Sequence, residues 1–108
     1  MSNPDSDFNK IIHEKVRLRI MSFLVSSPKE KAGFTHIKDA LALSSGNLSI
    51  QIKTLEEAGY VQVKKSFKNN KPYTEVILSS EGHKALVEYI EKMETFLTVL
   101  KQAKEKGK

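Results

Sequence analysis

The sequence predicts a mainly helical α+β fold for this chain of 108 residues. Apolar residues recur at spacings of three and four in several segments, as they do in helices that pack on a core. Between residues 60 and 78 the pattern changes to runs of β-branched and aromatic residues on either side of a polar loop, as in a two-stranded hairpin. A chain of this length is expected to form one domain whose core needs no disulfide or metal.

The first helix is expected to begin at Asp7 and to end before Pro28. Apolar side chains follow the helical spacing from Phe8 to Leu24, and proline disfavours helix in the residue before it. Residues 1–6 precede the pattern and are expected to form a frayed tail.

The second helix is expected to begin at Thr35, whose hydroxyl can cap it, and to run through Ala42. The segment KEKAGF before it is expected to form a loop. The side chains expected to face inward are Ile37, Ala40 and Leu41. Ile37 is also expected either to start a short third strand or to pack beneath the hairpin.

The third helix is expected to run from a cap at Ser44 or Ser45 to about Ala58. Gly59 then supplies the positive φ that ends a helix cleanly. The residues that share its inner face, at about 100° per residue, are Leu48, Ile52 and Leu55. About three residues separate this helix from the second one, which is the spacing of a helix-turn-helix.

The hairpin is expected to pair a strand at residues 60–64 with a strand at residues 73–78. The loop KNNKP between them contains the asparagines and the proline that turns need. The net charge of the chain is +5, and lysines gather around this loop with no acid among them.

The last helix is expected to span residues 79–104, with Ser79 or Ser80 as its cap and a basic tail at residues 105–108. Its apolar residues repeat at four and three, which is a heptad seam. A helix of this length measures ~40 Å, more than a core of this size can cover. The stripe either folds back on its own domain or, as we expect, pairs with the same helix of a second copy. The expected dimer residues are Phe8, Ile12, Leu86, Tyr89, Ile90, Met93, Phe96, Leu97 and Leu100.

The outer face of the third helix carries small or hydrogen-bonding side chains. Asparagine and glutamine can pair with adenine edges, lysine reaches guanine or phosphate, and isoleucine can press on a thymine methyl. The alternative is an ordinary polar surface. The residues expected to contact DNA from this helix are Ser45, Asn47, Ser49, Ile50, Gln51, Lys53 and Thr54.

The hairpin lysines are expected to hold DNA phosphates, together with basic residues of the first helix. The alternative is a solvated edge, because lysine also protects exposed strands from aggregation. The residues expected to contact DNA from the hairpin are Lys64, Lys65, Lys68, Asn69, Asn70 and Lys71. Phe67 and Tyr73 are expected to pack under the hairpin rather than to stack on bases.

Other classes of function lack support in the sequence. There is no cysteine, and His13, His36 and His83 lie on different segments, so we expect no metal site and no cofactor. No serine has a histidine and an acid in a recognisable arrangement, and no glycine-rich phosphate loop is present, so we expect no enzyme. No apolar run approaches the ~20 residues that span a bilayer, and the N-terminus is polar and acidic, so we expect a cytoplasmic protein.

Residues 9–90 resemble the winged-helix transcriptional regulators of the MarR and ArsR superfamily, most closely its small stand-alone domains. GNLSIQIKTLEEAGYV resembles the recognition helix and the following L-x-x-A-G-Y-V, and KKSFKNNKPYTEVILSSEGHKAL resembles the wing and the following L-T-x-E-G. The resemblance implies that residues 7–78 form a winged helix-turn-helix. It also implies a homodimer that binds double-stranded DNA and regulates transcription.

The sequence departs from that family in two respects. MarR wings usually carry Asp-x-Arg, whereas this wing has only lysines, so DNA binding is expected to rest on phosphates and to be sensitive to salt. The metal-sensing ArsR proteins use cysteine or clustered histidine and carboxylate ligands, which this chain does not offer.

Two further readings stay open. MarR proteins bind small aromatic molecules near the dimer helix, and here Phe8, Tyr89, Met93 and Phe96 could line such a site. The other reading is a winged helix that binds a protein and not DNA, since a fold does not fix a function.

Overall fold

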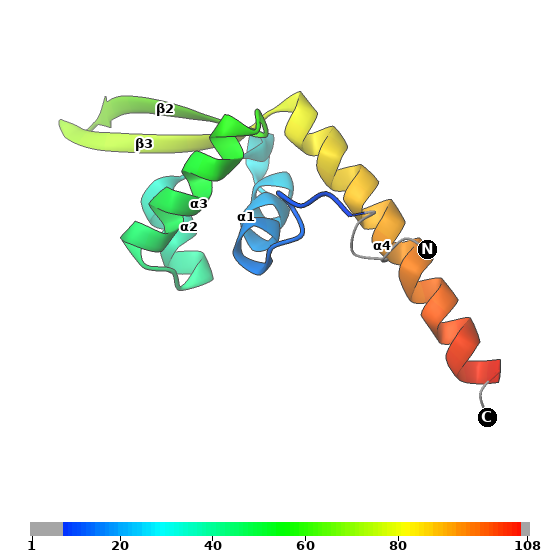
Figure 1. Cartoon of the computed structure of the whole chain (residues 1–108). Helices are drawn as coiled ribbons and strands as arrows, with labels where there is room; N and C mark the ends of the chain where they lie inside the picture. The colour runs from blue at the N-terminus through cyan, green and yellow to red at the C-terminus, as the bar shows by residue number, and fades with distance from the viewer. Residues whose placement is uncertain (1–7, 107–108) are drawn as a thin grey trace.

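Three short helices and a small sheet form a body from which one long helix extends, as Figure 1 shows. This computed structural model describes residues 8–106, so the tail expected at residues 1–6 lies outside the described part of the chain. The elements of the described part are α1 (Lys15–Val25), η2 (Pro28–Glu30), β1 (Lys31–Gly33), α2 (Phe34–Leu41), α3 (Ser45–Glu57), β2 (Val61–Lys68), β3 (Lys71–Leu78) and α4 (Ser80–Lys106). The predicted mainly helical α+β fold is confirmed.

The prediction for the start of the first helix is wrong, because residues 8–14 form turns and α1 begins only at Lys15. The Asn9 side chain accepts hydrogen bonds from the backbone N–H groups of Ile11 and Ile12, at 2.9 and 3.2 Å, which stabilises a turn in place of a helix. Glu14 is extended at φ −140°, and its carboxylate caps α1 by accepting from the Arg17 N–H. Between residues 8 and 14 the helical spacing of apolar residues therefore reflects their burial and not a helix.

The segment expected to be a loop before α2 contains β1, which pairs antiparallel with β3. The sheet order is β1-β3-β2. Gly33, not Thr35, occupies the cap position of α2, and no side chain caps that helix. Ile37 is fully buried in α2, so it packs in the core and starts no strand, while Ala40 is exposed and does not face inward as predicted.

The prediction for α3 is confirmed at both ends. The Ser44 hydroxyl accepts from the Asn47 N–H at 3.1 Å, so Ser44 is the cap. Ala58 ends the helix and Gly59 follows at φ +82°. The predicted inner residues Leu48, Ile52 and Leu55 are all buried.

The hairpin is longer than predicted. β2 and β3 pair from Val61 opposite Leu78 to Lys68 opposite Lys71, so only Asn69 and Asn70 form the turn. Both asparagines have positive φ, 54° and 63°, as the tight two-residue turns of hairpins require. The five-residue loop of the prediction is therefore wrong, since its outer residues belong to the strands.

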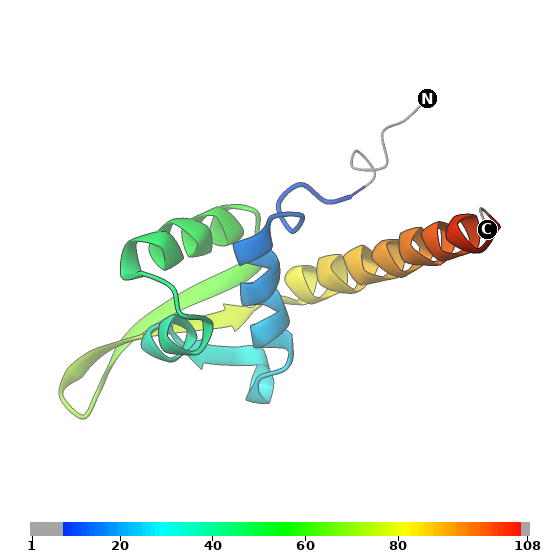
Figure 2. The same cartoon turned by 90° about the horizontal axis from the view of Figure 1, so that it is seen from below.

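α4 begins where predicted and ends two residues later, at Lys106. The Ser79 hydroxyl caps it by accepting from the Gly82 N–H at 2.9 Å. A Cβ at Gly82 would collide with the carbonyl of Tyr60, so this glycine lets the first turn of α4 lie against the start of β2. Figure 2 shows α4 extending away from the body, which gives the molecule extents of 62 × 25 × 24 Å. No helix in residues 8–106 is long and apolar enough to cross a membrane.

Candidate nucleic-acid interface

The outer face of α3 is the first part of the candidate interface. Ile50 is 65% exposed, which is unusual for an isoleucine. Thr54 is half-buried, and its hydroxyl donates to the Ile50 carbonyl of its own helix. The other predicted contact residues that α3 exposes are Ser45, Ser49 and Lys53.

Asn47 and Gln51 are half-buried and lie at the edge of this face, held by a side chain that the sequence-based prediction missed. The Arg17 guanidinium of α1 donates to Gln51 Oε1 at 2.8 Å, and Gln51 Nε2 donates to Asn47 Oδ1 at 3.1 Å. Arg17 was expected to reach phosphate with the other basic residues of the first helix. Instead its side chain is only 18% exposed and turned toward α3. Arg19 donates to the Leu41 carbonyl at the end of α2.

A groove of about 680 Å³ joins α3 to the hairpin. Ser49 and Lys53 line it from α3, and Val63 and Lys65 line it from β2. One predicted hairpin contact, Lys65, therefore lies along the same open groove as two predicted helix contacts, Ser49 and Lys53, and Glu56 also lines it.

The hairpin residues predicted to contact DNA are all exposed. Lys68 and Lys71 lie opposite each other at the end of the strands, beside the turn. Within residues 8–106 none of the four hairpin lysines forms an ion pair, so their charge is available to an anion. Lys68 Nζ lies 5.0 Å from the centre of the Tyr73 ring.

The prediction that Phe67 packs under the hairpin is wrong, because its side chain is 78% exposed. The far end of the hairpin extends beyond the helices (Figure 1), and Phe67 pairs with Pro72 close to that end. Side chains alternate along a strand, so Phe67 points to the same side as Lys65 and Val63, which is the side of α3. Tyr73 is half-buried, and its ring covers Gly33.

The expected dimer residues divide into two groups. Phe8, Ile12, Leu86 and Tyr89 are at most 6% exposed and belong to the core of the single chain, which corrects their assignment to an interface. The reason is that residues 8–13 cover the first turns of α4: the Phe8 ring lies 5.6 Å from that of Tyr89, and His13 Nδ1 lies 2.7 Å from the Tyr89 hydroxyl. Burial raises the pKa of the Tyr89 phenol.

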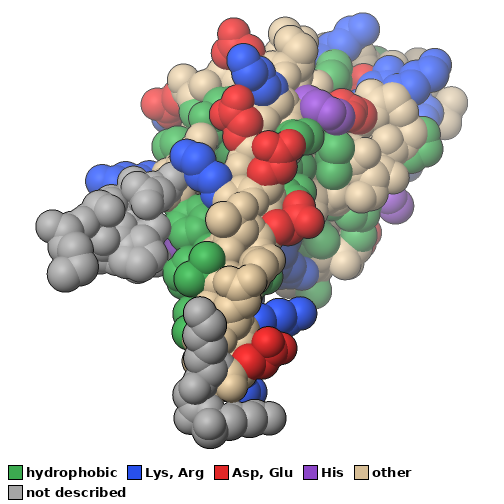
Figure 3. Space-filling view, turned by 90° about the vertical axis from the view of Figure 1, so that its right-hand side faces the viewer, with side chains coloured by type: hydrophobic (Ala, Val, Ile, Leu, Met, Phe, Trp, Pro, Cys, Tyr) green, Lys and Arg blue, Asp and Glu red, His purple; other side chains and the backbone are tan. Residues whose placement is uncertain are grey.

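The second group lies further along α4 and is open to solvent. Ile90, Leu97 and Leu100 are between 43% and 49% exposed, and Met93 and Phe96 are half-buried. Figure 3 shows hydrophobic side chains on one side of α4 and charged ones on the other. The end of the heptad seam is therefore an uncovered apolar stripe.

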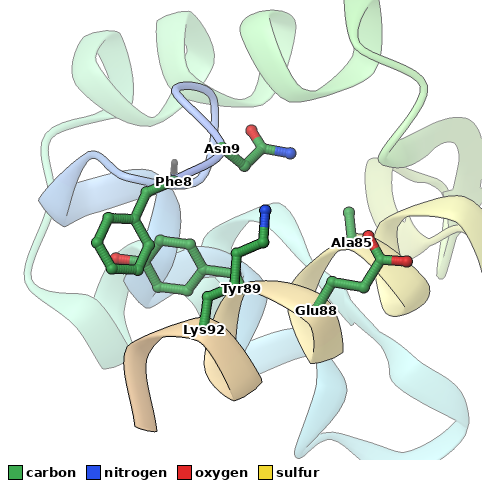
Figure 4. Close-up of a pocket in the computed structure, with 6 residues that line it drawn as sticks. All are labelled: Phe8, Asn9, Ala85, Glu88, Tyr89 and Lys92. Carbon is green, nitrogen blue, oxygen red and sulfur yellow. The ribbon is translucent and has the colours of Figure 1, made fainter. Parts of the chain in front are cut away.

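A small pocket of about 270 Å³ lies between the N-terminal segment and α4 (Figure 4). Of the residues considered for an aromatic effector, only Phe8 and Tyr89 line it, and Glu88 and Lys92 make its wall polar. Within the described residues, no group of three histidine or acidic side chains could hold a metal ion. His83 instead pairs with Glu30, with 2.7 Å between Nδ1 and Oε2.

A capped helix with an exposed outer face, packed after a second short helix and beside a lysine-bearing hairpin, defines a helix-turn-helix DNA-binding protein with a wing. Comparison with known proteins identifies the family. The chain belongs to the winged helix DNA-binding domain family, whose model matches residues 16–97. The protein is a winged-helix DNA-binding regulator, and its family is not one of enzymes.

Known proteins are similar to this chain in sequence or in structure. The chain is 35% identical over 81 residues to the uncharacterized protein MJ0432 of Methanocaldococcus jannaschii, which covers 75% of this chain and 86% of that one. A transcriptional regulator homologue of Pyrococcus horikoshii OT3 has a solved structure with 32% identity, a TM-score of 0.77, and coverage of 83% of this chain and 87% of its own. Sco3205, a MarR family regulator of Streptomyces coelicolor solved in complex with DNA, has 19% identity and a TM-score of 0.63 over 86% of this chain and 62% of its own, which supports the fold alone.

Proposed function

We propose that this protein is a homodimeric transcriptional regulator that binds specific sequences in double-stranded DNA. One observation supports the proposal most: Ser49 and Lys53 on the outer side of α3 and Lys65 of the hairpin line one open groove, and the other hairpin lysines are exposed beside it. A single duplex can therefore meet both at once, bases at the helix and phosphates at the hairpin.

Base contacts are assigned to α3. Its 13 residues measure about 20 Å, and the major groove of B-DNA admits a helix. The exposed Ile50 suits a thymine methyl, and Lys53 suits guanine or phosphate. The residues assigned to this role are Ser45, Asn47, Ser49, Ile50, Gln51, Lys53 and Thr54.

Phosphate contacts are assigned to the hairpin. Each lysine that neutralises a phosphate releases a counterion, so binding weakens as salt rises. Phe67 extends from the same strand toward the side of α3, where it can pack on a deoxyribose. The residues assigned to phosphate are Lys64, Lys65, Lys68, Asn69, Asn70 and Lys71.

The dimer is assigned to the exposed end of α4. Its stripe continues the apolar seam beyond the part that residues 8–13 cover, and monomeric proteins rarely leave such a stripe in water. Pairing with the same stripe of a second copy would bury Ile90, Leu97 and Leu100. Two-fold symmetry would then present α3 twice and favour a near-palindromic site.

DNA binding is tested by enrichment from a library of random duplexes at about 50 mM salt, followed by gel retardation of the enriched site. The proposal expects one enriched sequence with two related halves. If the purified chain retards no duplex under these conditions, the regulator proposal fails and a protein-binding winged helix takes its place.

The dimer is tested by sedimentation of two matched variants. Leu97→Asp places a charge in the stripe and is expected to yield monomers. Val99→Asp places the same charge on another exposed position, 56% exposed and about 200° around the helix, and is expected to leave dimers intact. A wild-type chain that sediments as a monomer, or two variants with equal behaviour, would contradict this interface.

A further inference from the structure

A series of hydrogen bonds links α1 to one edge of the outer face of α3. In the proposed function this face enters the major groove of DNA. Arg17 Nη1 donates to Gln51 Oε1 at 2.8 Å, and Gln51 Nε2 donates to Asn47 Oδ1 at 3.1 Å. The Asn47 backbone is fixed as well, because its N–H donates to the Ser44 cap. The first turn of α3 therefore carries an asparagine whose orientation is set from another helix.

The direction of these bonds follows from chemistry. A guanidinium has N–H donors and no acceptor, and it stays charged at any physiological pH. Gln51 must therefore turn its oxygen to Arg17, which leaves its NH₂ group to face Asn47. Asn47 in turn must offer its oxygen to Gln51, so its own NH₂ group points away from the chain of bonds. One charged donor thus sets the polarity of both amides.

Arg17 is itself held in place. Its Nε donates to the Ile11 carbonyl at 2.6 Å, and Glu14 Oε1 lies 3.9 Å from Nη1. Its side chain is 18% exposed, so water competes weakly for these bonds. The guanidinium keeps one orientation because contacts from two directions fix it.

We propose that Arg17 is a positioning residue that turns the NH₂ group of Asn47 outward, so that Asn47 recognises a base edge made of acceptors. Guanine, with O6 and N7 in the major groove, offers two acceptors. Adenine needs an amide that donates to N7 and accepts from N6 at the same time. The Asn47 oxygen has two lone pairs, but its bond from Gln51 turns it toward α1 and away from that pairing. The adenine pairing expected from residue type alone is therefore replaced by a preference for guanine.

This inference rests on the proposed function, and its experiment separates the two. Random duplexes are enriched with the full chain as wild type, Asn47→Ala, Arg17→Met and Arg19→Met. Asn47→Ala marks the base position that depends on Asn47. At that position the wild type is expected to favour guanine over adenine by about tenfold, the discrimination of one good base contact.

Arg17→Met removes the charged donor and frees both amides, so the guanine preference at this base position is expected to fall to about twofold or less. The base preferences at the other positions of the DNA site are expected to stay the same. Arg19→Met is the matched control: it removes the same charge from the same helix, but among the described residues Arg19 donates to the Leu41 carbonyl and not to α3. Its enriched site is expected to equal that of the wild type. Circular dichroism verifies that each variant is folded.

A second variant keeps the test sharp if Arg17→Met does not fold. Asn47→Asp replaces the donor group by an acceptor near the N-terminus of α3, where a negative charge is tolerated. Because a carboxylate accepts from cytosine N4, the preferred base is expected to change from guanine to cytosine. An adenine preference in the wild type, an unchanged site in a folded Arg17→Met, or an unchanged site in Asn47→Asp would each overturn the inference alone. A wild type that enriches no site would overturn the proposed function and the inference together.

Discussion

The two parts of the proposed DNA interface differ in how firmly the chain holds their side chains. On α3, Asn47 and Gln51 are half-buried and hydrogen-bonded to each other and to Arg17. On the hairpin, the lysines and Phe67 extend into solvent, and the described residues offer the lysines no ion pair. A fixed donor can discriminate between bases, whereas a free lysine attracts any phosphate. The difference teaches that specificity belongs to α3 and affinity to the hairpin.

The largest expected difference between the two regions is in the effect of a substitution on the free energy of unfolding. Leu48→Ala removes a fully buried side chain from the inner face of α3 and is expected to lower the free energy of unfolding by about 2–5 kcal/mol. Phe67→Ala, its counterpart on the hairpin, removes a side chain that is 78% exposed and should change it by no more than about 0.5 kcal/mol. Urea denaturation measures both. Equal losses would mean that the hairpin is part of the packed body.

Salt dependence gives the next largest effect. Lys68→Gln combined with Lys71→Gln removes the charge pair beside the turn and is expected to weaken duplex binding roughly tenfold at low salt. The slope of log affinity against log salt should flatten by about 1.8, since each lost phosphate contact contributes about 0.9. Binding titrations at several salt concentrations measure it. Lys29→Gln combined with Lys84→Gln removes the same charge from exposed positions outside the groove and hairpin, and should keep the slope.

The smallest effect is expected from Phe67. Phe67→Ala removes apolar contact with the duplex but no charge, so affinity should fall by about three- to tenfold, as partial burial of a ring implies. The salt slope should stay that of the wild type. Fluorescence anisotropy of a labelled duplex resolves this change. A flattened slope would mean that the ring acts by positioning the neighbouring lysines.

Much of this fold could be predicted because local rules decide it. The Ser44 cap, the Gly59 stop and the inner face at Leu48, Ile52 and Leu55 follow from residue type and helical period. The start of α1 could not be predicted in this way. The apolar period continues to Phe8, but the turn made by the Asn9 side chain outweighs it, and burial of Phe8 and Ile12 against α4 needs no helix.

The sequence predicts which side chains of the candidate site are exposed when no tertiary contact is involved. It does not predict those whose positions depend on tertiary contacts. The hairpin lysines are exposed as expected, since the hairpin extends beyond the helices and its far end packs on none of them. Arg17 carries no sequence signal that distinguishes it from Arg19, and only the packing of α1 against α3 shows which of them reaches Gln51. Phe67 was misplaced because its apolar character suggested burial, while the length of the hairpin decides its exposure.

The central claim, that α3 provides specificity and the hairpin affinity, is tested most directly by one ratio. The affinity for the enriched duplex is divided by the affinity for a scrambled duplex at a fixed salt concentration. For the Lys68→Gln, Lys71→Gln variant both affinities should fall together and leave the ratio of the wild type, whereas for Asn47→Ala the ratio should fall by about tenfold. A hairpin variant that lowers the ratio, or an Asn47→Ala variant that preserves it, would contradict the claim.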